Sequence, residues 1–137
     1  MYTKEEQKEH RELWVKALRS GEYEQGQGAL CQKKEDDGTI KYCCFGVACE
    51  ISGLGDFTLM PNLTSGYLDF VVDEQPQDAT VLPDAVRDWL GLSDRYGSYQ
   101  GSNHGDNDPC LMASNDEGVP FATIADIIES EPNELVN

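Results

Sequence analysis

Two adjacent cysteines, Cys43 and Cys44, lie where an extended segment is predicted to lead into a helix. A thiol at a helix N-terminus has a lowered pKa because the helix macrodipole stabilises the thiolate, so this is a common position for a cysteine nucleophile. Such a nucleophile also needs a base, and His104, oriented by Asp106 or Asp108, would complete a triad. No spacing in the sequence supports that triad, and cysteines in an apolar run are more often buried core residues.

A second set of candidate residues lies in segment 19–28, where Arg19, Tyr23 and Gln25 are close to flexible glycines. An arginine can bind a phosphate or carboxylate at two points, a tyrosine can stack, and a glutamine amide can bind a polar edge. Asn115 and Asp116 are further candidates for the same ligand. The alternative is that Arg19 pairs with a local carboxylate and Gln25 closes the loop. The segment lacks the lysine and the later glycine of phosphate-binding loops.

The sequence gives little support for a metal site. Cys44 and Cys49 have four residues between them, but on a helix they would point apart, and a zinc site needs converging ligands such as three cysteines with His104. The five cysteines are Cys31, Cys43, Cys44, Cys49 and Cys110. Oxygen ligands of the kind that calcium prefers occur at 106–108 and 115–116, without an EF-hand loop. Asn and Asp also stabilise turns by themselves, so we expect no metal and no cofactor.

The elements that must position these residues are organised around the apolar run 42–53, which predicts a buried helix ending at Gly53. Before it, Thr3 and Glu6 form a capping-box pattern that opens a helix at 3–20, with residues 1–10 projecting into solvent. Asp37-Gly38 predicts a hairpin turn between strands 29–33 and 39–43.

The second half of the chain alternates short elements with loops. A strand is expected at 68–72 and an extended piece at 79–82, and Pro83 opens a helix that Gly91 ends. A long Gly- and Asn-rich loop at 93–109 offers Tyr96 and Tyr99 as a contact surface, or is simply a solvated loop. A fourth helix starts at Pro120. These elements predict a single α+β domain over 1–137, with a small antiparallel sheet of two to four strands packed with about four helices.

The composition limits the partners. The net charge is −16, from 26 acidic and 10 basic side chains, so nucleic-acid phosphates and anionic membranes are repelled and basic protein surfaces are favoured. The plainer reading is that the charge only keeps the protein in solution. We find no apolar run of about 18 residues and no signal-peptide pattern, so we expect a cytoplasmic protein with reduced thiols.

Four sequence motifs follow one another along the chain, each occurring once. They are W-x-x-A-L-R-S-G-x-Y-x-Q-G at Trp14, Y-C-C-x-G-V-x-C at Tyr42, L-P-x-x-V-x-x-W-L-G-L at Leu82, and N-D-x-G-x-x-F-x-x-I-A-D-x-I-E at Asn115. Together they cover about half the chain, and the sequence resembles a family of small uncharacterised proteins of bacteriophages and prophages. The resemblance implies a phage setting in a bacterial host cell and no named activity. Pro120 stands where the family is associated with serine, and proline also suits a helix start.

Several functions remain open from the sequence. The leading expectation is a non-enzymatic accessory protein that binds a host component for counter-defence, by occupying a basic protein surface or by sequestering a small nucleotide signal. The alternatives are a cysteine-dependent enzyme that uses Cys43 or Cys44, and a structural or regulatory phage protein without a ligand. We expect no direct nucleic-acid binding and no membrane association.

Overall fold

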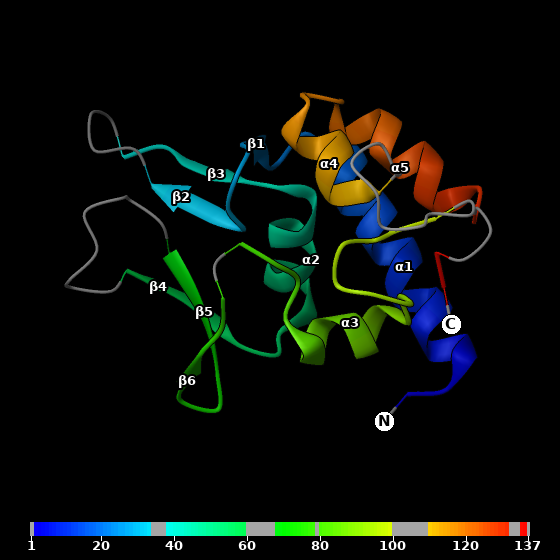
Figure 1. Cartoon of the computed structure of the whole chain (residues 1–137), viewed down its shortest axis with the longest axis horizontal. Helices are drawn as coiled ribbons and strands as arrows, with labels where there is room; N and C mark the ends of the chain where they lie inside the picture. Colours follow the sequence, from blue (N-terminus) through cyan, green and yellow to red (C-terminus); the bar gives the residue numbers. More distant parts are fainter. Residues whose placement is uncertain are drawn as a thin grey trace.

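The computed structural model of the chain describes residues 2–33, 38–59, 68–78, 80–99, 110–131 and 135–136. Helix α2 lies in the middle, the other helices pack on one side of it, and two small sheets lie on the other side (Figure 1). In chain order the elements are α1 (Lys4–Arg19), β1 (Glu24–Gln25), β2 (Cys31–Lys33), β3 (Ile40–Tyr42), α2 (Cys44–Ser52), β4 (Asp56–Leu59), β5 (Leu68–Val72), β6 (Gln75–Pro76), α3 (Asp84–Leu90), α4 (Leu111–Asp116) and α5 (Phe121–Glu129).

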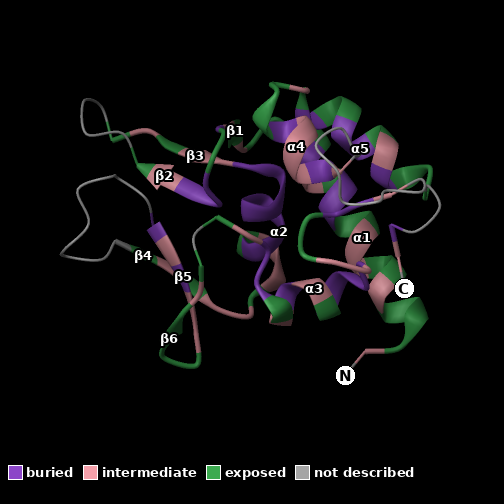
Figure 2. Ribbon diagram, viewed as in Figure 1, coloured by how far each residue is buried: buried purple, intermediate pink, exposed green. Residues whose placement is uncertain are grey.

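Helix α2 is the core of the molecule because almost all of its side chains are apolar. Its residues from Cys44 to Cys49 are buried, as the continuous purple of the ribbon shows (Figure 2). A Cβ atom on Gly46 would lie 1.8 Å from the carbonyl oxygen of Leu30, so only glycine lets the two backbones come this close. Trp14 of α1 donates its indole N–H to the Cys44 carbonyl oxygen at 2.8 Å.

Helix α1 begins with the predicted capping box, in which Thr3 and Glu6 each accept a backbone hydrogen bond from the other. Its first turn is exposed, but three later side chains reach the C-terminal end of α3. Gln7, His10 and Arg11 contact the carbonyl oxygens of three consecutive α3 residues at 2.6–2.7 Å. Helix α3 ends at Gly91, whose left-handed backbone N–H donates to the Asp88 carbonyl oxygen at 3.2 Å, and α1 supplies further donors to this end of the helix.

The two sheets have three strands each. In the first the order is β1-β3-β2, with β1 parallel and β2 antiparallel to β3, and in the second β4-β5-β6 is antiparallel throughout. A continuous aromatic contact joins them, since the Tyr42 and Phe57 ring centroids are 6.0 Å apart and those of Phe57 and Phe70 are 5.0 Å apart. Phe70 is fully buried, so this contact ties the second sheet to the core.

The predicted fold class, a small single α+β domain, is confirmed. The helices expected at 3–20, in the run 42–53, after Pro83 and after Pro120 are present, and so are the hairpin strands and the strand at 68–72. The structure differs in having α4 as a further helix and two sheets in place of one. Residues 80–82 form no strand, and residue 79 and most of the 93–109 loop lie outside the described residues. Among the described helices, none is both long enough and apolar enough to cross a membrane.

Candidate functional site

Three motif segments that are far apart in the sequence meet at the N-terminus of α2. The side chain of Asn115 accepts hydrogen bonds from the Cys44 backbone N–H at 3.1 Å and from the Gln25 amide at 3.0 Å, and it donates to the Gly26 carbonyl oxygen at 2.8 Å. Gln25 also donates to the Val119 carbonyl oxygen at 2.7 Å. The first, second and fourth motifs of the sequence are therefore joined through one buried side chain, Asn115.

This network is satisfied from within the chain. Asn115 is fully buried, and both N–H groups of the Gln25 amide donate to protein oxygens. The Cys44 N–H is one of the four donors that an α-helix leaves unpaired at its start, and Asn115 supplies the missing acceptor. The side chains of Gln25 and Asn115, both predicted as ligand contacts, are thus brought together and used to hold the loop after α1 against α2 and α4.

Asp116 lies at the edge of this network and remains exposed. Its side chain accepts a hydrogen bond from the Gly28 backbone N–H at 3.0 Å. A cavity of about 10 Å³ lies beside it, enough for a single water molecule. Its walls are formed by Gly28, Ala29, Cys43, Cys44, Thr80, Met112, Asn115 and Asp116. This space excludes a nucleotide-sized ligand.

The thiols next to this network are in the predicted place but in an unfavourable environment for the thiolate. Cys43 is the N-cap residue of α2, and backbone N–H groups of Gly46 and Phe45 favour its thiolate. Burial opposes them and dominates, raising the pKa of Cys43 to about 11 and that of Cys44 well above its ordinary value. Burial likewise raises the pKa of Cys31 to about 12. The helix-terminus effect that the sequence suggested is therefore outweighed by desolvation.

Other parts of the predicted chemistry are not assembled among the described residues. His104, Asp106 and Asp108 lie outside them. Within the described ranges no three His, Cys, Asp or Glu side chains come together as a metal site would require. Cys110 caps α4, its sulfur accepting from the Ala113 N–H at 3.4 Å.

Arg19 lies apart from the other candidates, on the groove between α1 and α5. Its guanidinium binds the carboxylates of Asp126 and Glu129, the latter at 2.7 Å. A neighbouring pocket of about 200 Å³ contains a second pair in its lining, Arg11–Glu131, at 3.3 Å. It is lined by Lys8, Arg11, Glu12, Val15, Ile128, Glu129 and Glu131. Both arginines of this groove are therefore engaged with α5 or the residues after it.

Tyr23 packs against Tyr42, with ring centroids 5.3 Å apart and planes at 87°. Burial, with the nearby carboxylates of Glu50 and Glu22, raises the pKa of its hydroxyl. Burial also raises the pKa of Tyr42 to about 12, with smaller contributions from Cys31 and Glu50. The sequence did not single out Tyr42 or Glu50, although Glu50 is the only charged residue in the apolar helix.

The aromatic residues of the following loop have different roles. Tyr96 is exposed, and Tyr99 is half-buried against the core. Asp94 accepts hydrogen bonds from the backbone N–H groups of Tyr96 and Ser98, which orders the start of the loop.

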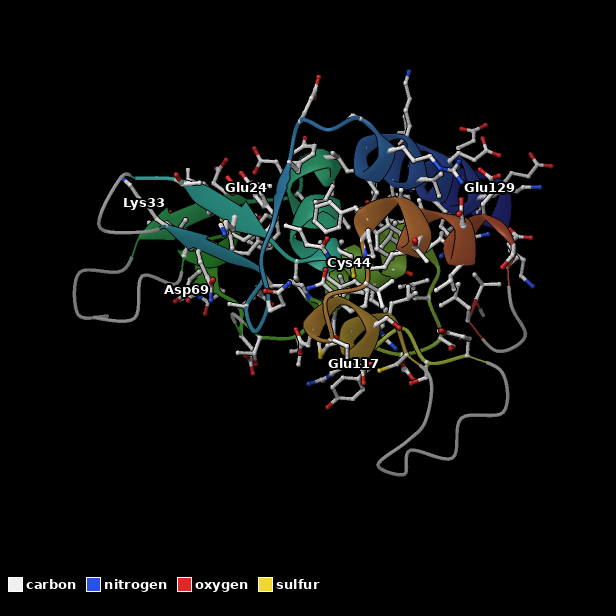
Figure 3. All side chains as sticks on the ribbon, turned by 90° about the horizontal axis from the view of Figure 1, so that it is seen from above. Glu24, Lys33, Cys44, Asp69, Glu117 and Glu129 are labelled. Atoms are coloured by element: carbon white, nitrogen blue, oxygen red, sulfur yellow. The ribbon has the colours of Figure 1, made fainter. Side chains whose placement is uncertain are left out.

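Charged and polar side chains at the surface surround the buried residues around α2. Cys44 lies in the middle of the molecule, whereas Glu117 and Glu129 lie at its outside (Figure 3).

Comparisons with curated proteins and with solved structures give no match. A family model described as a domain of unknown function, DUF8296, matches residues 6–132, which is nearly the whole chain and includes every motif described above. The protein therefore belongs to the DUF8296 family.

Proposed function

We propose that this protein is a non-enzymatic binding protein whose acidic surface occupies a basic surface of a partner protein. The proposal rests on one observation: several of the protein's basic side chains are paired with carboxylates, whereas most of its carboxylates have no basic partner among the described residues. Of the few basic side chains, Arg11, Arg19, Lys41 and Arg87 lie within 4 Å of carboxylates of the same chain. With a net charge of −16, most carboxylates have no such partner within the described part of the chain.

The interior contacts favour binding over catalysis. The thiols of Cys43 and Cys44 are buried with raised pKa values, and an unactivated thiol is a poor nucleophile at neutral pH. Gln25 and Asn115 form hydrogen bonds with each other and with backbone carbonyl oxygens. These hydrogen bonds fix both side chains in place within the fold.

A protein partner is also favoured over a small nucleotide. Phosphate groups would have to displace Asp126 and Glu129 from Arg19, against the repulsion of two carboxylates. A basic protein surface needs no such exchange, because it meets carboxylates that are already free. Its attraction for this chain is long-ranged and speeds encounter at low salt.

The resemblance of the four motifs to phage and prophage proteins supports a biological setting for this activity. We propose that the protein acts in the cytoplasm of a bacterial host cell, against a host defence component with a basic surface. An acidic protein can occupy such a surface in competition with the nucleic acid that normally binds there.

The test is capture of partners from bacterial lysate at low salt, followed by binding measurements with the purified partner. We expect a partner with a basic surface, an affinity that falls at least tenfold between about 50 and 300 mM salt, and competition by duplex DNA. The control is an unrelated basic protein of similar size, which should bind at least tenfold more weakly. A partner whose affinity does not change with salt would refute the proposal, as would a bound small molecule in native mass spectrometry.

A further inference from the structure

Two tyrosines in edge-to-face contact lie near two exposed carboxylates that, in addition to burial, raise the pKa of the Tyr23 hydroxyl. We call Glu22, Tyr23, Tyr42 and Glu50 the tyrosine–carboxylate patch. The two rings are in edge-to-face contact at 5.3 Å and are both half-buried, whereas Glu22 and Glu50 are exposed. Phe57 supports Tyr42 from the side of the second sheet, with its ring centroid 6.0 Å away. The rings are therefore held in place while part of their surface faces solvent.

Glu50 occupies a position that is unfavourable for the isolated chain. It lies in the last turn of α2, where the helix macrodipole repels a carboxylate and would favour a cation. This turn contains no basic residue, and neither Glu50 nor Glu22 has an ion-pair partner among the described residues. The nearby cation Lys41 is paired with Glu24 at 3.8 Å. A cation delivered by another molecule would thus remove an uncompensated repulsion.

We propose that the tyrosine–carboxylate patch binds an arginine side chain of the basic partner protein, an inference that rests on the proposed function. A guanidinium group is planar, stacks on tyrosine faces, and donates hydrogen bonds to carboxylates at its edges. The patch offers these two features together: tyrosine rings to stack on, and carboxylates beside them. A lysine ammonium would use the carboxylates but would gain less from stacking.

The test uses a capped peptide, Gly-Arg-Gly-Arg-Gly, titrated into the full chain while the ring resonances of Tyr23 and Tyr42 are followed by NMR. Two matched peptides carry lysine or the uncharged citrulline in place of arginine. We expect both rings to shift with the arginine peptide, weaker binding of the lysine peptide, and no shift with the citrulline peptide. Equal binding of the arginine and lysine peptides would overturn the assignment to arginine.

Two charge-matched variants locate the binding. Glu50→Gln should weaken binding of the arginine peptide at least fivefold and raise the thermal unfolding midpoint, because it removes the repulsion at the end of α2. Glu9→Gln, on an exposed position of α1, removes the same charge and should change the affinity less than twofold. Equal effects of the two variants would show attraction by net charge alone and overturn the patch.

The same variants separate this inference from the proposed function. Salt-dependent binding of a basic partner that is equal in wild type and Glu50→Gln would refute the patch and leave the proposed function standing. Absence of any salt-dependent binding to a basic partner by the wild-type chain would refute both.

Discussion

Asn115 connects three segments of the chain through one side-chain amide. It accepts from the Cys44 N–H at 3.1 Å, donates to the Gly26 carbonyl oxygen at 2.8 Å and accepts from Gln25 at 3.0 Å. Two neighbouring side-chain amides could recognise a ligand. Here they hold segments of the chain together instead. The reason is geometric: the start of a buried helix and a glycine-rich loop both leave backbone groups without partners, and water cannot reach them.

Asn115→Ala should destabilise the protein by about 4 kcal/mol, because the Cys44 N–H and the Gly26 carbonyl would be left buried without partners. Urea unfolding measures this change. The neighbouring Asp116→Asn is the control and should cost less than about 1 kcal/mol, since an amide oxygen can still accept the Gly28 hydrogen bond. Similar losses in the two variants would contradict the role given to Asn115.

The five thiols should differ sharply in reactivity. Cys110 is half-buried whereas the other four are buried, so it should react with a disulfide reagent in the native protein at pH 8. The other four should react on the order of 100-fold more slowly, when the structure opens. Cys110→Ser should abolish the fast phase and preserve the fold, because serine is a good N-cap. A fast phase that survives this substitution and disappears in Cys43→Ser would restore the nucleophile hypothesis.

At the scale of the elements, α2 can lie against the segment before β2 only because Gly46 lacks a side chain. Gly46→Ala should lower the free energy of unfolding by about 3 kcal/mol or more, since its Cβ would lie 1.8 Å from the Leu30 carbonyl oxygen. This steric cost outweighs the gain of about 1 kcal/mol that alanine brings to a helix. Gly21→Ala, which meets open space at a positive φ, should cost only about 1 kcal/mol and serves as the control. A neutral Gly46→Ala would refute the close approach.

The elements that the sequence predicts are those with strong local signals. Capping residues, apolar spacing and glycine stops define α1, α2, α3 and α5. Strand β1 is two residues long and exists only because it pairs with β3, so no local pattern marks it. Strands β4 and β6 depend in the same way on β5, and the turn between β5 and β6 uses Asp73 and Glu74 at positive φ, where Asn-Gly would have been the expected signal.

The sequence identifies several residues that come together in the structure, but it does not show which groups their side chains bind. Gln25, Asn115 and Cys44 do converge, but a list of residue types does not tell whether an amide faces a ligand or the backbone of its own chain. Arg19 illustrates the same limit, since its two carboxylate partners come from α5, more than 100 residues later in the sequence. Glu50 could have been noticed as the lone charge of an apolar helix, whereas its approach to Tyr23 depends on how α2 packs beside β1.

At the scale of the whole molecule, the buried thiols make stability depend on alkaline pH. Unfolded thiols have a pKa near 9.0, whereas burial raises the pKa of folded Cys43 to about 11 and of Cys31 to about 12. Between these values the unfolded state binds fewer protons than the folded state, so the free energy of unfolding falls as pH rises. Each such thiol contributes up to about 1.4 kcal/mol per pH unit. Urea unfolding between pH 8 and pH 11 should show a steep decline that begins near pH 9.

A single substitution checks the origin of this decline. Cys49→Ala removes a thiol whose pKa burial also raises, so its stability curve should be shallower than that of the wild type by up to about 1.4 kcal/mol per pH unit. Identical slopes would show that Cys49 does not contribute to the alkaline loss, which would then rest on Cys31, Cys43 and Tyr42, whose pKa values burial also raises.

The packing of α1 against α5 also determines when the fold can be completed. The first helix leaves the ribosome early, but α5, on which it packs, is made only after roughly 100 further residues, which takes about 5–20 s. During that interval α1 exposes the apolar stripe that α5 later covers. Chains that stop before α5 should therefore be the ones that chaperones and proteases recognise.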